Sequence, residues 1–171
     1  MTDIEKILSG GDLRSIGKSN SIITEIKNQN DFDELFKYLF HEDRLFVMRA
    51  ADTIEKITII HPQYLANHKI EIFELCNVAN DKELKWHVAL LIPRLRLDTK
   101  EFSRAWKTLS NWAKDKTNSR IVRVNSIQGL FDMIKQKSEL EKDFSLTLTA
   151  LEKENIPSIN ARIRKLKNIS R

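Results

Sequence analysis

The sequence repeats itself at an interval of 38 residues, and this periodicity limits the possible fold more than any other feature. The segment DRLFVMRAADTIEKI (43–57) aligns without a gap with DKELKWHVALLIPRL (81–95), which places Ala51 on Ala89. Two looser copies follow, NSRIVRVNSIQGLFDM (118–133) and PSINARIRKL (157–166). Self-similarity at this period is typical of stacked helical hairpins, in which each pair of helices buries a face against the next pair.

The apolar residues recur with the period of an α-helix. Within 102–113 they fall at i, i+3, i+4, i+7, i+10 and i+11, which is one helical face. No segment shows the sustained alternation of a half-buried strand. The helices that pair with the repeat copies are expected at 31–40, within 62–79, at 98–114 and at 139–154. The sequence therefore predicts an all-α protein, an α-α superhelix of about four helical hairpins.

Local signals place the starts of several helices. Asp98-x-x-Glu101 and Ser138-x-x-Glu141 have the spacing of capping boxes, and Pro62 and Pro157 suit first-turn positions. We expect a single domain over 1–171, with N-terminal helices and a Gly-rich loop in 1–30 and helical-pair repeats at 31–60, 61–97, 98–137 and 138–171.

The repeat VMRAADTIEKI is similar to the second helix of a HEAT repeat. From LSGGDLRSIGKSN through WHVALLIPRL and RIVRVNSIQGL to PSINARIRKL, the chain resembles a group of small bacterial HEAT-repeat proteins over nearly all of its 171 residues. The resemblance implies an armadillo-like superhelix and does not imply a particular activity.

The net charge of +5 is unevenly distributed. Residues 1–117 carry 18 basic and 18 acidic side chains, whereas residues 118–171 carry 11 basic and 6 acidic ones. This excess favours an anionic partner. No apolar run is long enough to cross a membrane, and the N-terminus lacks the basic start and apolar stretch of a signal peptide. We therefore expect a cytoplasmic protein without a membrane partner.

Gly-Lys-Ser at 17–19 raises the question of a phosphate-binding loop. A P-loop needs a second glycine five residues before Gly17, followed by a helix and preceded by a strand. Asp12 occupies that position, Gly11 lies one residue too early, and an aspartate repels phosphate. No nucleotide is expected. Instead, Gly10 is expected to end the first helix, and the cap of the next helix is expected among Ser19, Asn20 and Ser21.

The histidines and the single cysteine lack the spacing of a metal site. No His-x-x-x-His pair occurs, so neither a metal nor another cofactor is expected. Cys76 lies among apolar residues without a basic neighbour and is interpreted as a small buried hydrophobe. Surface or capping positions are expected for the four histidines, His41, His61, His68 and His87.

The three tryptophans divide by their position on the expected helices. Trp106 lies within the apolar stripe of its helix, and Trp112 lies at the edge of that stripe. Trp86 is placed at the edge of a groove, where its ring is a candidate for ligand contact.

The second helix of each hairpin normally lines the concave side of a HEAT superhelix. Opposite the core stripe of the first copy lie Arg49, Asp52 and Lys56, and the gap-free alignment gives His87, Leu90 and Arg94 in the second. Arg120 and Arg123 occur in the third copy, and Arg164 in the fourth. The candidate ligand-binding residues of the concave face are Arg49, Asp52, Lys56, Trp86, His87, Arg94, Arg123 and Arg164.

Two functions fit this pattern. The first is a non-catalytic scaffold that binds a partner protein or peptide along the concave face. The alternative is binding of a DNA or RNA backbone by a basic concave track, with a HEAT-like DNA glycosylase as a remote variant. A glycosylase needs an acidic group in the groove, and Asp52 is the one aspartate on the proposed ridge.

Overall fold

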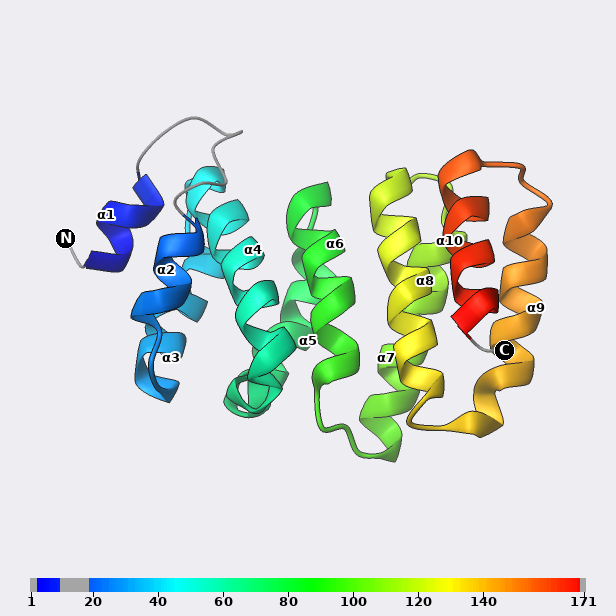
Figure 1. Ribbon diagram of the computed structural model, residues 1–171, viewed down its shortest axis with the longest axis horizontal. Helices are drawn as coiled ribbons and strands as arrows, with labels where there is room; N and C mark the ends of the chain where they lie inside the picture. Colours follow the sequence, from blue (N-terminus) through cyan, green and yellow to red (C-terminus); the bar gives the residue numbers. More distant parts are fainter. Residues whose placement is uncertain (1–2, 10–18, 170–171) are drawn as a thin grey trace. The chain divides into compact units, whose positions relative to one another are not determined.

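The computed structural model describes residues 3–9 and 19–169, and every regular element in these ranges is helical (Figure 1). The α-helices are α1 (Asp3–Ser9), α2 (Ser19–Glu25), α3 (Gln29–Lys37), α4 (Arg44–Ile60), α5 (Lys69–Val78), α6 (Lys82–Leu91), α7 (Thr99–Lys114), α8 (Arg120–Ile134), α9 (Glu141–Glu152) and α10 (Pro157–Ile169). Short 3₁₀ turns are η2 (Tyr38–Phe40), η3 (Pro62–His68), η4 (Ile92–Arg94) and η5 (Ser138–Leu140). The predicted all-α class is confirmed. Gly10, the expected end of the first helix, lies outside the described residues, as do Gly17 and Lys18 of the Gly-Lys-Ser motif.

The chain divides into two compact units, Met1–Glu71 and Ile72–Arg171, and each is described by itself. In the first unit, α1, α2 and α3 all pack on α4, which is the central helix. In the second unit, α8 lies between α6 and α10, while α7 packs on α8 and α9 packs on α10 (Figure 1). The second unit is thus two layers of helices, with α6, α8 and α10 side by side in one of them.

The 38-residue repeat is visible in the helix starts. α4, α6 and α8 begin at residues 44, 82 and 120, so equivalent positions differ by 38 in all three helices. Ala51, Ala89 and Ile127 are equivalent in this register, and each is fully buried. The same holds for the next core position of the three helices, which is occupied by Ile54, Ile92 and Leu130. The alignment of the first two copies therefore identifies core positions correctly.

The packing of α6 on α8 depends on a glycine. A Cβ atom built on Gly129 would lie 2.6 Å from the carbonyl oxygen of Ala89 and 2.9 Å from Cδ1 of Leu109. Real Cβ contacts are longer, so no larger residue fits here without separating the helices. Gly129 thus lets the backbones of α6 and α8 approach closely.

The signals for helix starts had mixed outcomes. At α7 the capping box is confirmed, because the Asp98 side chain accepts from the Glu101 backbone N–H at 2.9 Å and the Glu101 carboxylate accepts from the Asp98 N–H at 2.8 Å. Pro62 and Pro157 do open helical turns. The predicted box from Ser138 is wrong, because residues 138–140 form a 3₁₀ turn and α9 begins only at Glu141.

Candidate functional site

Arg49 lies in the interior of the first unit. Its side chain projects from α4, only 4% of the residue is exposed, and its guanidinium donates to the backbone carbonyl of Leu8 in α1. The helix α1 leaves its last carbonyls without intrahelical partners, and Arg49 satisfies one of them. Its predicted position on a solvent-facing ridge is therefore wrong, since the charge is used to hold α1 on α4.

Arg123 is also buried, with 2% of the residue exposed. Its Nε donates to the carbonyl of Ala113 at the end of α7, at 2.8 Å. Its Nη2 lies 2.9 Å from both carboxylate oxygens of Glu154, which follows α9. A buried arginine needs such a partner because an unpaired charge in the interior is costly. The prediction that Arg123 faces a groove is wrong, and its role is to connect α7, α8 and the α9–α10 turn.

His87 is the third candidate that the structure buries, with 2% exposed. Its ring centroid lies 4.0 Å from that of Trp86, which keeps part of its own surface in solvent. In the 38-residue register, Arg49, His87 and Asn125 are equivalent, and all three are buried. This position of the repeat is therefore an interior polar position, which corrects its assignment to a ligand-facing ridge.

The register of the third copy also changes which residues lie on the predicted ridge. Positions 52 and 56 of α4 correspond to Leu90 in α6 and Arg94 in η4, and to Gln128 and Asp132 in α8. All of these are partly exposed, as the ridge hypothesis requires. However, α8 contributes an amide and a carboxylate there and not Arg120 or Arg123. The two ridge positions of α8 therefore carry no cation, although the basic track needs one in each repeat.

The remaining solvent-reaching positions form a mixed surface in the second unit. We call it the even-helix face, and it consists of Trp86 and Leu90 on α6, Arg94 in the η4 turn that follows α6, Ile121, Gln128 and Asp132 on α8, and Lys165 and Ile169 on α10. The helix α10 adjoins the α8 part of this face, since Nη1 of Arg162 on α10 donates to the Gln128 side chain at 2.6 Å. Arg164, the candidate of the fourth repeat copy, is also exposed on α10, next to Lys165. The face combines apolar and aromatic groups with both signs of charge.

In the first unit, the candidates Asp52 and Lys56 interact with each other. Their side chains form an ion pair of 2.7 Å between successive turns of α4, and both are partly exposed. A pair of this kind contributes little to stability. The carboxylate required for the glycosylase variant is thus paired with a neighbouring ammonium group.

A sequence model of the HEAT repeat domain matches residues 12–169. The chain belongs to the HEAT-repeat family. No significant match was found among curated proteins or among solved structures. No helix in the described part of this HEAT-repeat chain is both long and apolar enough to span a membrane.

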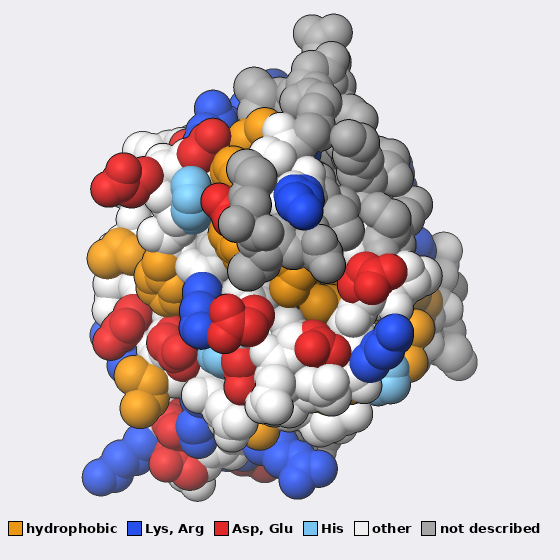
Figure 2. All heavy atoms as spheres, turned by 90° about the vertical axis from the view of Figure 1, so that its left-hand side faces the viewer, with side chains coloured by type: hydrophobic (Ala, Val, Ile, Leu, Met, Phe, Trp, Pro, Cys, Tyr) orange, Lys and Arg blue, Asp and Glu red, His pale blue; other side chains and the backbone are white. Residues whose placement is uncertain are grey.

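The two units of the HEAT-repeat chain differ in charge. Residues 1–71 carry 9 basic and 12 acidic side chains, and residues 72–171 carry 20 and 12, so their net charges are −3 and +8. Figure 2 views the chain from the side of α1–α3, where acidic, basic and hydrophobic side chains are interspersed on the described surface. The basic character of the protein therefore belongs to the second unit.

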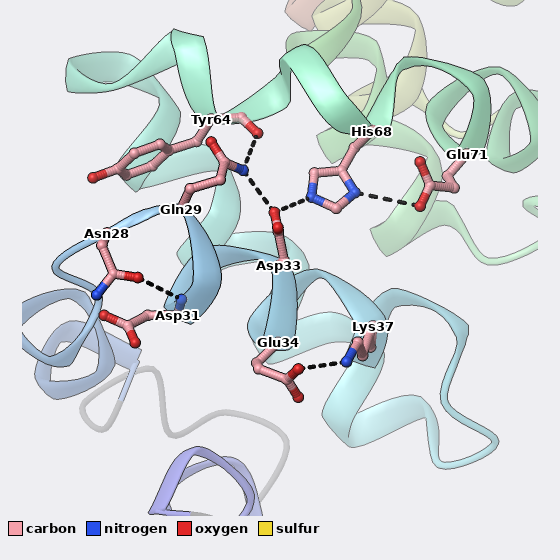
Figure 3. Close-up of polar contacts among 9 residues, drawn as sticks. All are labelled: Asn28, Gln29, Asp31, Asp33, Glu34, Lys37, Tyr64, His68 and Glu71. Atoms are coloured by element: carbon pink, nitrogen blue, oxygen red, sulfur yellow. Dashed lines mark hydrogen bonds and ion pairs between the residues drawn. The ribbon is translucent and has the colours of Figure 1, made fainter.

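One polar cluster was not anticipated from the sequence. His68 lies between two carboxylates, with Nε2 at 2.7 Å from Asp33 and Nδ1 at 3.3 Å from Glu71, and its ring stacks on Phe36 at 3.9 Å (Figure 3). Gln29 donates to the same Asp33 carboxylate at 2.6 Å and to the backbone carbonyl of residue 64 at 3.0 Å. The cluster contains no nucleophile and ties α3 to η3, so we interpret it as a structural clasp.

Within the described ranges, no group of three or more His, Cys, Asp or Glu side chains is arranged to hold a metal ion. Burial raises the pKa of the Cys76 thiol to about 12, so the reactive thiolate is not formed near neutral pH. His41 and His61 are exposed as expected, but the surface or capping positions expected for His68 and His87 are wrong, because both are buried.

Trp106 and Trp112 are both buried, which agrees with core packing. The indole N–H of Trp106 donates to the carboxylate of Asp143 in α9 at 2.8 Å. Trp112 packs under the ammonium group of Lys85, which lies 5.0 Å from its ring centroid. Of the three tryptophans, Trp86 alone keeps a partly exposed ring for contact with a ligand.

Proposed function

We propose that this HEAT-repeat chain is a non-catalytic cytoplasmic scaffold that binds a partner protein or peptide on the even-helix face. The observation that carries the proposal is the composition of that face. It offers apolar groups at Trp86, Leu90 and Ile121 beside charges of both signs at Arg94 and Asp132. Protein interfaces typically place aromatic and aliphatic anchors within a polar rim.

The burial of Arg49 and Arg123 disfavours the predicted basic track as a nucleic-acid groove. Each phosphate contact needs its own accessible cation. Arg49 and Arg123 have their guanidinium groups in the interior, and the α8 part of the ridge carries Asp132. A mixed surface of this kind suits a polypeptide, whose side chains include apolar groups and both charges.

The experiment is a selection of random peptides of about 15 residues on the purified chain, followed by calorimetry with the best binder. Leu90→Glu should weaken its binding at least tenfold, because a charge replaces an apolar anchor. Thr149→Glu is the matched control, since Thr149 is exposed on α9, outside the even-helix face. Equal affinity for both variants, or equal loss in both, would contradict the proposal.

A further inference from the structure

The helix α7 carries a row of cations on its outer face. Lys100, Arg104, Lys107 and Lys114 follow one another at i, i+4, i+7 and i+14, and all four are exposed. At 100° per residue these positions fall within a narrow stripe of the helix. The opposite side of α7 is buried against the unit, through Phe102, Ala105, Trp106, Leu109 and Ala113. We call the four cations the α7 ridge.

No member of the α7 ridge forms an ion pair with a carboxylate among the described residues. Elsewhere in the same unit, exposed lysines do have such partners: Lys135 pairs with Asp132 at 2.8 Å and Lys167 with Glu152 at 2.7 Å. Arg104 lies over the ring of Phe73, with 4.7 Å from its guanidinium carbon to the ring centroid. This contact positions the group and leaves its charge uncompensated.

The acidic residues that flank α7 are occupied by other donors. Glu101 belongs to the capping box at the helix start. Asp143 accepts the indole N–H of Trp106. Asp115, after the last turn, accepts from the backbone N–H and the hydroxyl of Thr117 at 2.9 and 2.7 Å, and these bonds lower its pKa. The neighbouring carboxylates therefore serve the fold, and the ridge cations face solvent without them.

We infer that the α7 ridge binds the sugar-phosphate backbone of a nucleic acid. The unit that carries it has a net charge of +8. From Lys100 to Lys114 the ridge spans about 21 Å at about 1.5 Å per residue, a length over which duplex DNA presents about 12 phosphates. Four cations along one helix face thus meet several phosphates without any need for base contacts.

The absence of apolar groups on the ridge selects a nucleic acid over the other polyanions. The large exposed hydrophobic side chains of the described residues are Phe40, Ile59, Ile60, Ile70, Val78, Ile121, Leu146 and Ile169, and none of them is on α7. A membrane-surface helix needs an apolar face to enter the lipid. A protein interface needs apolar or aromatic anchors. Backbone phosphate recognition requires neither.

This inference is independent of the proposed function, because the ridge and the even-helix face share no residue. The test measures fluorescence anisotropy of a labelled 20-base-pair DNA duplex, and of an RNA duplex, between 50 and 200 mM salt. Lys107→Glu/Lys114→Glu should weaken binding at 50 mM salt at least tenfold. The plot of log affinity against log salt should become less steep, and the magnitude of its slope should decrease by about 2, at about 0.9 for each cation removed.

The matched control is Lys142→Glu/Lys153→Glu, which makes the same change of charge on α9 and directly after it, where both residues are exposed and lie outside the even-helix face. It should weaken binding less than threefold, and circular dichroism of both variants should match that of the wild type. Three results would overturn the inference. They are no wild-type binding at 50 mM salt, equal losses in the two double variants, and equal binding of polyglutamate or of phosphatidylserine vesicles.

Discussion

Replacing Gly129 with alanine sets two effects on the free energy of unfolding against each other. Alanine in place of glycine stabilises a helix interior by about 1 kcal/mol. The added Cβ, however, would lie 2.6 Å from the Ala89 carbonyl oxygen and 2.9 Å from Cδ1 of Leu109. The leucine methyl can rotate away, but the carbonyl belongs to the backbone of α6. Overpacking costs about 1–3 kcal/mol, and a clash with a backbone atom belongs to the upper half of that range, so we expect a net loss of about 1–2 kcal/mol.

Urea unfolding followed by tryptophan fluorescence measures this loss in the relevant part of the chain. All three tryptophans, like Gly129, lie in the second unit. Asn111→Ala is the control, because Asn111 is exposed on α7 and its replacement changes helix propensity without adding a packing contact. If Gly129→Ala is as stable as the wild type or more stable, the close approach of α6 and α8 is refuted.

Three further outcomes follow from the packing and the burial. Ala51→Leu should lower the free energy of unfolding by about 1–3 kcal/mol in thermal melts, because Ala51 is fully buried at a helix contact, and an unchanged melting temperature would refute the repeat register. Arg123→Ala should lower the free energy of unfolding in urea by about 2–4 kcal/mol, because it leaves the Ala113 carbonyl and the Glu154 carboxylate without their partner. An unchanged free energy would show that Arg123 is not structural. The pKa of the Cys76 thiol rises from 9.0 to about 12 on folding, so Cys76 should resist a thiol reagent at pH 8 until the chain is unfolded. For the same reason the free energy of unfolding should fall from pH 9 towards pH 12. Rapid labelling of the native protein would contradict this.

The sequence predicts the helical hairpins well because their signals are local. The spacing of apolar residues is set within each helix, and a gap-free alignment is enough to relate α4 to α6. The capping box at Asp98 is likewise a contact over three residues. Family membership follows from the same repetition, since residues 12–169 match the HEAT repeat domain.

The register of α8 could not be predicted, for a physical reason. Residues 122–127 are six consecutive buried positions, so this central helix has no single apolar stripe. Three of them, Arg123, Asn125 and Ser126, are polar, which makes them look like surface positions. A helix enclosed by neighbours on several sides loses the pattern from which its orientation is inferred.

The burial of Arg49 was hidden for a different reason. Its acceptor is the backbone carbonyl of Leu8, 41 residues earlier in the chain. Every residue has such a carbonyl, so the sequence does not indicate which one accepts the bond. The clasp of His68 with Asp33 is similarly distant in sequence, 35 residues apart. In the sequence alone, a polar side chain that is buried against a distant partner cannot be distinguished from one that is exposed to bind a ligand.

The measurement that tests the proposed scaffold most directly is positional photocrosslinking in the native host. A photoreactive amino acid is placed at Leu90, at Gln128 and at Lys165 on the even-helix face, and at Ser103 and Thr149 on exposed positions of α7 and α9 as controls. The account predicts one partner polypeptide, of the same mass, crosslinked from the three face positions and from neither control. Crosslinks of equal yield from all five positions, or from the controls alone, would contradict it.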